Sequence, residues 1–130
     1  MNRSSYYFRN IAQQGQNTTN SINMNLSSLS VAWTTTDSKK EADFLAYQSI
    51  ELHLAVCAQV DVPIESFFPW KNRIEKSSEF RITFKAFPAN IENLERFIDE
   101  NHSYETPEWI VLEETKVSEK YLNWAKDLPR

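Results

Sequence analysis

The chain has 130 residues, of which 41% are hydrophobic and 13% aromatic, and this is enough apolar material for one folded domain. Its only glycine is Gly15, which excludes the glycine-rich loops of nucleotide-binding sites and the glycine-flanked nucleophile of many hydrolases. The net charge of −4 argues against nucleic acid and anionic membranes as partners, and no uncharged apolar run approaches the roughly 18 residues of a membrane span.

The first 29 residues form a polar extension. Asn, Ser, Gln and Thr occupy 17 of the first 30 positions, and Arg3 and Arg9 are the only charged residues before Asp37. Such a segment buries too little apolar surface to offset the entropy of ordering, so we expect a flexible tail at residues 1–29 and a folded domain at residues 30–130. A targeting presequence is the alternative, because organelle signals contain Arg and Ser and lack acids.

The folded domain begins with a strand and a helix. The β-branched residues of 29–36 predict the strand, which ends at Asp37. Ser38 and Glu41 have the spacing of a capping box, in which the Ser38 hydroxyl accepts from the Glu41 amide and the Glu41 carboxylate reaches back to Ser38. The helix that follows turns small and apolar residues toward the core, namely Ala42, Leu45, Ala46, Ser49 and Ile50.

A long hairpin is predicted next. Residues 54–70 form a strand bent near Pro63, because proline cannot donate to a central ladder. The turn is Lys71-Asn72-Arg73, with Asn72 suited to a positive φ. In the return strand, which ends at Phe87, the alternation of Phe80, Ile82 and Phe84 points one face inward.

The remaining elements complete a repeat. Pro88 begins a helix that ends near His102, residues 108–114 read as a last core strand, and Ser118 caps a terminal helix that presents Tyr121, Trp124 and Ala125. The order predicts an α+β fold, a ferredoxin-like βαββαβ sandwich with a long central hairpin and a C-terminal helix. Strands that overrun a small sheet expose edges and aromatic side chains, so we expect oligomerisation.

Several segments together resemble the CutA divalent-ion tolerance family over about residues 30–127. The Tyr-x-x-Pro-Glu turn after a helix and the Trp-Lys-x-x-Ile-Glu hairpin are specific in combination. The matching segments are Leu54-Ala55-Val56-Cys57, Trp70-Lys71-Asn72-Arg73-Ile74-Glu75, Lys85, His102-Ser103-Tyr104-Glu105-Thr106-Pro107-Glu108 and Tyr121-Leu122-Asn123-Trp124.

The resemblance implies a ferredoxin-like homotrimer whose long hairpins pair between subunits. It also implies structural kinship with the PII signalling proteins and a role in tolerance of copper and other divalent metals. No settled enzymatic activity comes with the resemblance, and we expect none. The expected function is therefore that of a metal-binding or scaffold protein in divalent-metal response. The alternative is a PII-like sensor that binds an anion in a cleft between subunits. The single cysteine, Cys57, favours a reducing compartment, hence the cytoplasm.

Two residues are candidate metal ligands. Some members of the family bind copper through a cysteine in the first strand and two adjacent histidines, and the matching positions here are Trp33, Asn101 and His102, so only His102 keeps its ligand. Cys57 is the second candidate, because thiolate suits soft Cu(I). The structural alternatives are a buried cysteine and, for His102 as for His53, a histidine at a helix end.

A second cluster is a candidate ligand cleft. It consists of Lys85, Tyr104, Glu108 and Trp70, with Glu79 as a possible neighbour. In a trimer these groups would line a cleft between subunits that takes an anion or a metal complex. The alternative is a structural corner in which Tyr104 anchors a turn and Glu108 pairs with Lys85. An enzyme would need His102 to act with Ser103 or Glu108, and we expect none.

The scarcity of glycine itself makes a prediction about turns. The hairpin glycines of the family correspond to Pro63 and Asn72 here, and the glycine before the terminal helix corresponds to Val117 or a neighbour. A left-handed conformation at Asn72 would cost up to about 1 kcal/mol relative to glycine.

Overall fold

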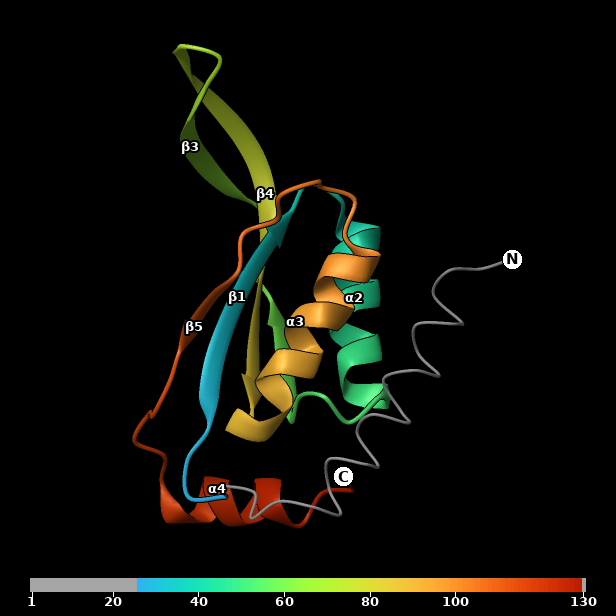
Figure 1. Cartoon of the computed structure of the whole chain (residues 1–130), viewed down its shortest axis with the longest axis vertical. Helices are drawn as coiled ribbons and strands as arrows, with labels where there is room; N and C mark the ends of the chain where they lie inside the picture. Colours follow the sequence, from blue (N-terminus) through green and yellow to red (C-terminus); the bar gives the residue numbers. More distant parts are fainter. Residues whose placement is uncertain (1–25, 130) are drawn as a thin grey trace, which may run out of the picture.

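The computed structural model describes residues 26–129 (Figure 1), so the expected flexibility and the alternative targeting role of the extension concern residues 1–25, outside the described part. Leu29, which the predicted boundary places in the flexible extension, is buried. The predicted α+β order is confirmed. The elements are β1 (Ser30–Thr36), α2 (Lys39–Glu51), β2 (Cys57–Val60), β3 (Ile64–Trp70), β4 (Arg73–Ala86), η1 (Pro88–Asn90), α3 (Ile91–Asn101), β5 (Ile110–Leu112) and α4 (Glu119–Lys126).

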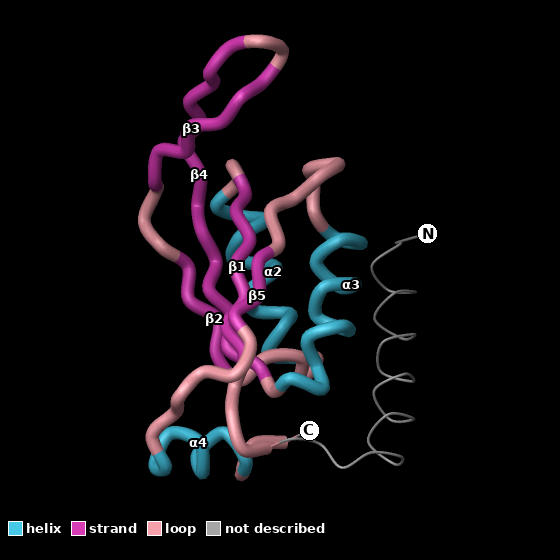
Figure 2. The backbone as a smooth tube through the Cα atoms, turned by 60° about the vertical axis from the view of Figure 1, so that its left-hand side comes forward, coloured by secondary structure: helices cyan, strands magenta, loops and turns pink. Residues whose placement is uncertain are grey.

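The sheet has the strand order β2-β4-β1-β5, and every neighbouring pair is antiparallel. Helices α2 and α3 lie side by side on one face (Figures 1 and 2), which is the layer arrangement of a ferredoxin-like fold. The hydrophobic core lies between the sheet and these two helices. Ile82 and Phe84 are fully buried in it, as their alternation predicted, while Arg81 on the other face is exposed.

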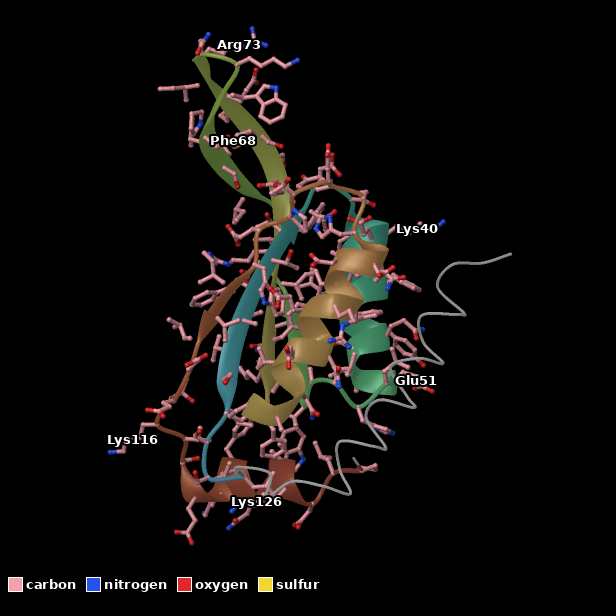
Figure 3. All side chains as sticks on the ribbon, in the orientation of Figure 1. Lys40, Glu51, Phe68, Arg73, Lys116 and Lys126 are labelled. Carbon is pink, nitrogen blue, oxygen red and sulfur yellow. The ribbon has the colours of Figure 1, made fainter. Side chains whose placement is uncertain are left out.

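The hairpin of β3 and β4 leaves the sheet. β3 pairs only with the first half of β4, from Trp70 opposite Arg73 to Ile64 opposite Glu79, whereas the second half of β4 pairs with β1 and β2. The predicted bend is confirmed, because β2 ends at Val60 and β3 begins at Ile64. In Figure 1 the hairpin projects beyond the helices, with Arg73 at its tip in Figure 3.

Four residues other than glycine take a positive φ within residues 26–129: His53 at 58°, Lys71 at 49°, Asn72 at 64° and Glu114 at 51°. Asn72 was predicted to do so, and Lys71 joins it in a two-residue hairpin turn. His53 follows the C-terminus of α2, where the amide of Leu54 donates to the carbonyl of Ser49 at 2.9 Å. This is the Schellman geometry that glycine normally serves.

The strand predicted at residues 108–114 is present, but it is shorter and less buried than a core strand. β5 covers only Ile110–Leu112, pairs with β1 alone and forms an edge of the sheet. Ile110 and Leu112 are about half exposed, and only Trp109 and Val111 pack against the core. The apolar run is not buried on both faces because the helices cover one side of the sheet only.

Helix α4 lies at the end of the molecule opposite the hairpin (Figure 1). The Ser118 hydroxyl accepts from the Tyr121 amide at 3.3 Å, so the predicted cap is present. Ala125 is buried there in a second hydrophobic cluster with Leu29 and Phe87. None of the helices in the described part of the chain is long and apolar enough to cross a membrane.

Candidate functional site

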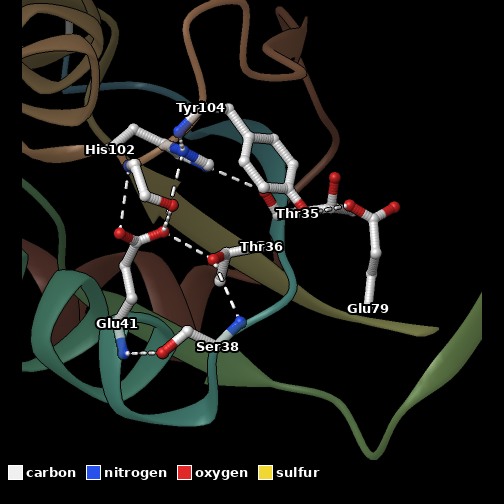
Figure 4. Close-up of polar contacts among 8 residues, drawn as sticks. Thr35, Thr36, Ser38, Glu41, Glu79, His102 and Tyr104 are labelled. Carbon is white, nitrogen blue, oxygen red and sulfur yellow. Dashed lines mark hydrogen bonds and ion pairs between the residues drawn. The ribbon is translucent and has the colours of Figure 1, made fainter. Parts of the chain in front are cut away.

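A polar network joins the start of α2 to the segment after α3 (Figure 4). The Ser38 hydroxyl accepts from the Glu41 amide at 3.1 Å, as the capping box predicts. The Glu41 carboxylate, however, does not return to Ser38, whose amide donates to Thr36 instead. The Glu41 carboxylate instead accepts hydrogen bonds from the hydroxyl of Thr36 and, at 3.0 Å each, from the amide and the hydroxyl of Ser103. Glu41 thus ties β1, α2 and the segment after α3 together.

The side chain of His102 is fully buried beside this network, and both of its ring nitrogens have partners. Nε2 donates to the carbonyl of Thr35 at 2.8 Å, while Nδ1 accepts from the amide of Tyr104 at 3.0 Å. Because Nδ1 is an acceptor, its 3.7 Å separation from Glu41 is not an ion pair. The ring therefore fixes the start of the turn that carries Tyr104, and a metal ion could bind only if one of the two bonds opened.

Tyr104 points from this turn toward β4. Its hydroxyl donates to the Glu79 carboxylate at 2.7 Å, and Glu79 is only 7% exposed (Figure 4). Burial first, then the hydrogen bond and charge of Glu79, and then the charge of Asp37 raise the pKa of Tyr104 far above its ordinary value near 10. The phenol therefore stays neutral and donating at physiological pH, and it satisfies part of the hydrogen-bonding capacity of a buried carboxylate.

Two other residues of the predicted cleft, Trp70 and Lys85, lie apart from this pair in the single chain. Trp70 pairs with Arg73 at the hairpin tip, six residues from Glu79 along β4, and Lys85 lies six residues away in the opposite direction. At about 3.3 Å per residue each separation is about 20 Å. The chain itself therefore brings Glu79 and Tyr104 together, but neither Trp70 nor Lys85 joins them.

The alternative pairing of Lys85 with Glu108 is wrong within one chain. Lys85 stands opposite Val31, which stands opposite Leu112, so Glu108 lies four residues further along the strand direction, about 13 Å away. The Lys85 ammonium group instead lies 5.7 Å from the centre of the Tyr121 ring. A cation over an aromatic face is attracted by the ring quadrupole, which explains the orientation.

Cys57 lies beside Lys85 at the α4 end of the sheet. It is half-buried, and its side chain is hydrogen-bonded to Tyr121; burial and then the proximity of Cys57 raise the pKa of that phenol. Cys57 pairs with Lys85, which pairs in turn with Val31 of β1, whereas His102 contacts Thr35, four residues further along β1. The two candidate metal ligands are therefore separated by about 13 Å along the sheet. They cannot bind one ion together within a chain.

Trp33 and Asn101, which the sequence resemblance matches to expected copper ligands, are structural side chains here. The Trp33 indole donates to Thr83 at 3.0 Å, and the Asn101 amide donates to the carbonyl of Phe97 at 2.8 Å. Among residues 26–129, no three His, Cys, Asp or Glu side chains lie close enough together to hold a metal ion. A cation site of several such ligands would need more than one subunit.

Ser103 and Glu41 are the residues that the sequence did not reveal as partners. They are 62 residues apart, and Glu41 was assigned to a local cap. The Ser-x-x-Glu spacing shows that Glu41 stands near the helix start, but nothing in the sequence places Ser103 there. Because the Ser103 hydroxyl donates to Glu41, it is not arranged for proton transfer to His102.

Comparisons with known proteins agree with this architecture. The family model described as "CutA1 divalent ion tolerance protein" matches residues 30–128. The chain is 31% identical over 100 residues to the chloroplastic CutA protein of Arabidopsis thaliana, covering 77% of this chain and 55% of that one, and 31% identical over 101 residues to human CutA, covering 78% and 56%. It thus spans about half the length of these relatives.

Solved CutA1 structures also match the fold of this chain. The CutA1 structure from Ehrlichia chaffeensis aligns with a TM-score of 0.74 at 26% identity, over 78% of this chain and 94% of that chain. The CutA1 structure from Oryza sativa aligns with a TM-score of 0.74 at 28% identity, over 79% and 95%. With its sheet, hairpin and Tyr104 turn matched over residues 30–128, the chain belongs to the CutA1 divalent ion tolerance family.

Proposed function

We propose that this protein acts in divalent-metal tolerance as a homotrimeric binding or scaffold protein of the cytoplasm, copper being the metal to test first, and that it is not an enzyme. Family membership supports the divalent-cation role. One observation about the chain supports the assembly: the β3–β4 hairpin projects from the sheet with large apolar side chains exposed. Phe67 is 65%, Trp70 55% and Ile74 78% exposed.

Such a hairpin is a poor structure for an isolated chain. Two strands outside a larger sheet are marginally stable in water, and exposed apolar groups favour association. Pairing of the hairpin with a neighbouring subunit would cover these side chains. It would also bring Trp70 of one subunit toward groups of another, as a ligand cleft made of Trp70, Glu79, Lys85, Tyr104 and Glu108 requires.

The candidate metal ligands fit such an arrangement only in part. Cys57 and His102 offer the soft sulfur and imidazole donors that copper prefers, but they lie about 13 Å apart along the sheet of one chain. Cys57 would have to leave Tyr121, and His102 would have to leave Thr35 or Tyr104. Each would therefore need ligands from another subunit.

Light scattering tests the assembly. The native chain should have about three times the 15.3 kDa mass of one subunit, and Phe67→Asp should lower it, because a charge in a buried interface is costly. Tyr47→Asp is the matched control: Tyr47 on α2 is 67% exposed, like Phe67 at 65%, but lies away from the hairpin. A native chain that stays monomeric at micromolar concentration would refute the trimer.

Calorimetric titration with copper tests the metal role. His102→Ala and Cys57→Ser should each weaken binding, whereas His53→Ala, which removes an exposed imidazole, should not. Equal binding by the native chain and both variants would remove Cys57 and His102 as ligands.

A PII-like sensor of an anion is the second candidate. The observation in its favour is Lys85, whose ammonium group lies over the Tyr121 ring and forms no ion pair with a carboxylate within residues 26–129. It is thus available for an anionic ligand. If copper does not bind but a nucleotide or organic anion does, and Lys85→Gln abolishes that binding, the results favour the sensor function over the metal function.

A further inference from the structure

An apolar stripe follows the outer side of α2. Phe44, Tyr47 and Ile50 recur at steps of three and therefore lie on one side of the helix. They are 38%, 67% and 40% exposed, so the stripe faces away from the sheet. The stripe ends beside Glu51, the last residue of α2, which lies toward the α4 end of the molecule in Figure 3.

The stripe continues into a pocket of about 280 Å³. Ile50 and Glu51 belong to both features. The rest of the lining comes from the segments after α2, from η1 and its flank, and from α4 and the segment after it. It is mostly apolar and consists of His53, Ala55, Val56, Phe87, Asn90, Ala125, Leu128 and Pro129.

The pocket adjoins the place where the described chain begins. Phe87 and Ala125 line the pocket and also form the second hydrophobic cluster with Leu29. Leu26, the first described residue, packs against this cluster. The residues before Leu26 are therefore attached at one end of a mostly apolar path, which runs through the pocket, past Glu51, and along α2 to Phe44.

The charges of α3 and of residues 1–25 are complementary. The outer side of α3 exposes four carboxylates beside the single guanidinium of Arg96, and these acids are Glu92, Glu95, Asp99 and Glu100. Residues 1–25 contain no acid, carry Arg3 and Arg9, and include the apolar group Tyr6-Tyr7-Phe8. Opposite charges around an apolar contact favour one partner over others.

The length of the segment is also sufficient. The 13 residues of α2 extend about 20 Å at 1.5 Å per residue, and an extended chain spans that distance with about six residues. A segment of 25 residues attached at Leu26 can therefore reach every part of the path.

We propose that the pocket and the α2 stripe are the docking surface for residues 1–25 of the same chain, with the Tyr6-Tyr7-Phe8 group on the stripe and the two arginines facing the acidic side of α3. The proposal concerns the outer side of the helical layer and is independent of the hairpin and of metal binding. It gives the extension a specific place on the folded domain.

Limited proteolysis of the full chain tests the proposal. Trypsin cleaves after Arg9, and when opening is fast relative to cleavage the rate follows the population of undocked segment. Trypsin should cleave the double variant Tyr47→Asp/Ile50→Asp about 5- to 30-fold faster than the native chain. This factor corresponds to a loss of about 1–2 kcal/mol of docking free energy. Val62→Asp is the matched control, because Val62 is 80% exposed but lies near the hairpin bend, and this variant should be cleaved at the native rate.

A second variant identifies the occupant. Replacing Tyr6, Tyr7 and Phe8 by Ser in the full chain should accelerate cleavage by the same factor, after correction for the rates of synthetic peptides of residues 1–25 with the same sequences. Circular dichroism checks that each variant folds. A native chain cut as fast as the α2 variant overturns the proposal. So does acceleration by the α2 variant alone, because the surface would then bind a different partner.

Discussion

At the residue scale, the Glu79–Tyr104 pair shows how a buried carboxylate is accommodated. A buried carboxylate is costly unless its oxygens accept hydrogen bonds, and the Tyr104 hydroxyl provides one at 2.7 Å. The same charge, together with burial, raises the pKa of the Tyr104 phenol, so Tyr104 stays protonated and keeps donating. Tyr104 contributes to stability fully below pH 10, and this contribution is lost as the pH rises toward its raised pKa.

Glu79→Gln should lower the pKa of Tyr104 toward 10, because the amide can still accept the hydrogen bond but carries no negative charge. The measurement is the alkaline titration of tyrosinate absorbance, with Tyr104 identified by subtraction of a Tyr104→Phe variant. Glu105→Gln, an exposed acid next to Tyr104, is the control and should leave the titration unchanged. An unchanged Tyr104 titration in Glu79→Gln would show that the Glu79 charge does not contribute.

At the element scale, the described chain makes left-handed turns without glycine. His53 ends α2 and Lys71-Asn72 closes the hairpin, all with φ between 49° and 64°. Asn tolerates this region better than most residues, because its short polar side chain bonds locally, whereas His and Lys do so less readily. The strain is small and is offset by the helix and hairpin hydrogen bonds that these turns complete.

Replacing these residues by glycine should therefore stabilise the protein. We expect His53→Gly and Asn72→Gly each to raise the free energy of unfolding by up to about 1 kcal/mol, measured by urea denaturation. Asn123→Gly, in the exposed middle of α4, is the control and should destabilise by about 0.5–1 kcal/mol. A marked loss in Asn72→Gly would mean that its side chain, and not the turn geometry, is what the hairpin needs.

At the scale of the whole molecule, Glu41 links elements that are distant in sequence. Its carboxylate joins the end of β1 at Thr36 to Ser103 after α3, and His102 joins the same segment to Thr35. The turn that carries Tyr104 is thus positioned by the sheet and α2 together. Hydrogen bonds to a charged group contribute about 1.5–3 kcal/mol each, so this link is a substantial part of the stability.

Glu41→Gln should lower the free energy of unfolding by about 1.5–3 kcal/mol, because the amide turns a donor toward groups that need an acceptor. Glu92→Gln, an exposed acid in the first turn of α3, should change it by no more than about 0.5 kcal/mol. Equal effects of the two substitutions in urea denaturation would show that the network contributes no more than a solvated charge.

The element order, the caps at Ser38 and Ser118, the bend before Ile64 and the turn at Asn72 were predictable from the sequence. Each of them depends on residues within a few positions of one another, so local patterns of charge, size and backbone preference determine them. The family is recognisable for the same reason, since its motifs are short segments in a constant order. The scarcity of glycine is also a local signal, because it predicts that residues other than glycine take a positive φ at the turns.

Only the tertiary structure decided which side chains meet. Four results depend on strand register and on which sheet face the helices cover. They are the choice of Glu79, out of the residues of the predicted cleft, as the partner of Tyr104, the link between Glu41 and Ser103, the separation of Cys57 from His102, and the edge position of Ile110–Leu112. A register brings together residues dozens of positions apart, and no local pattern encodes it alone. The sequence therefore determined the elements and the family, while the packing of those elements determined the site.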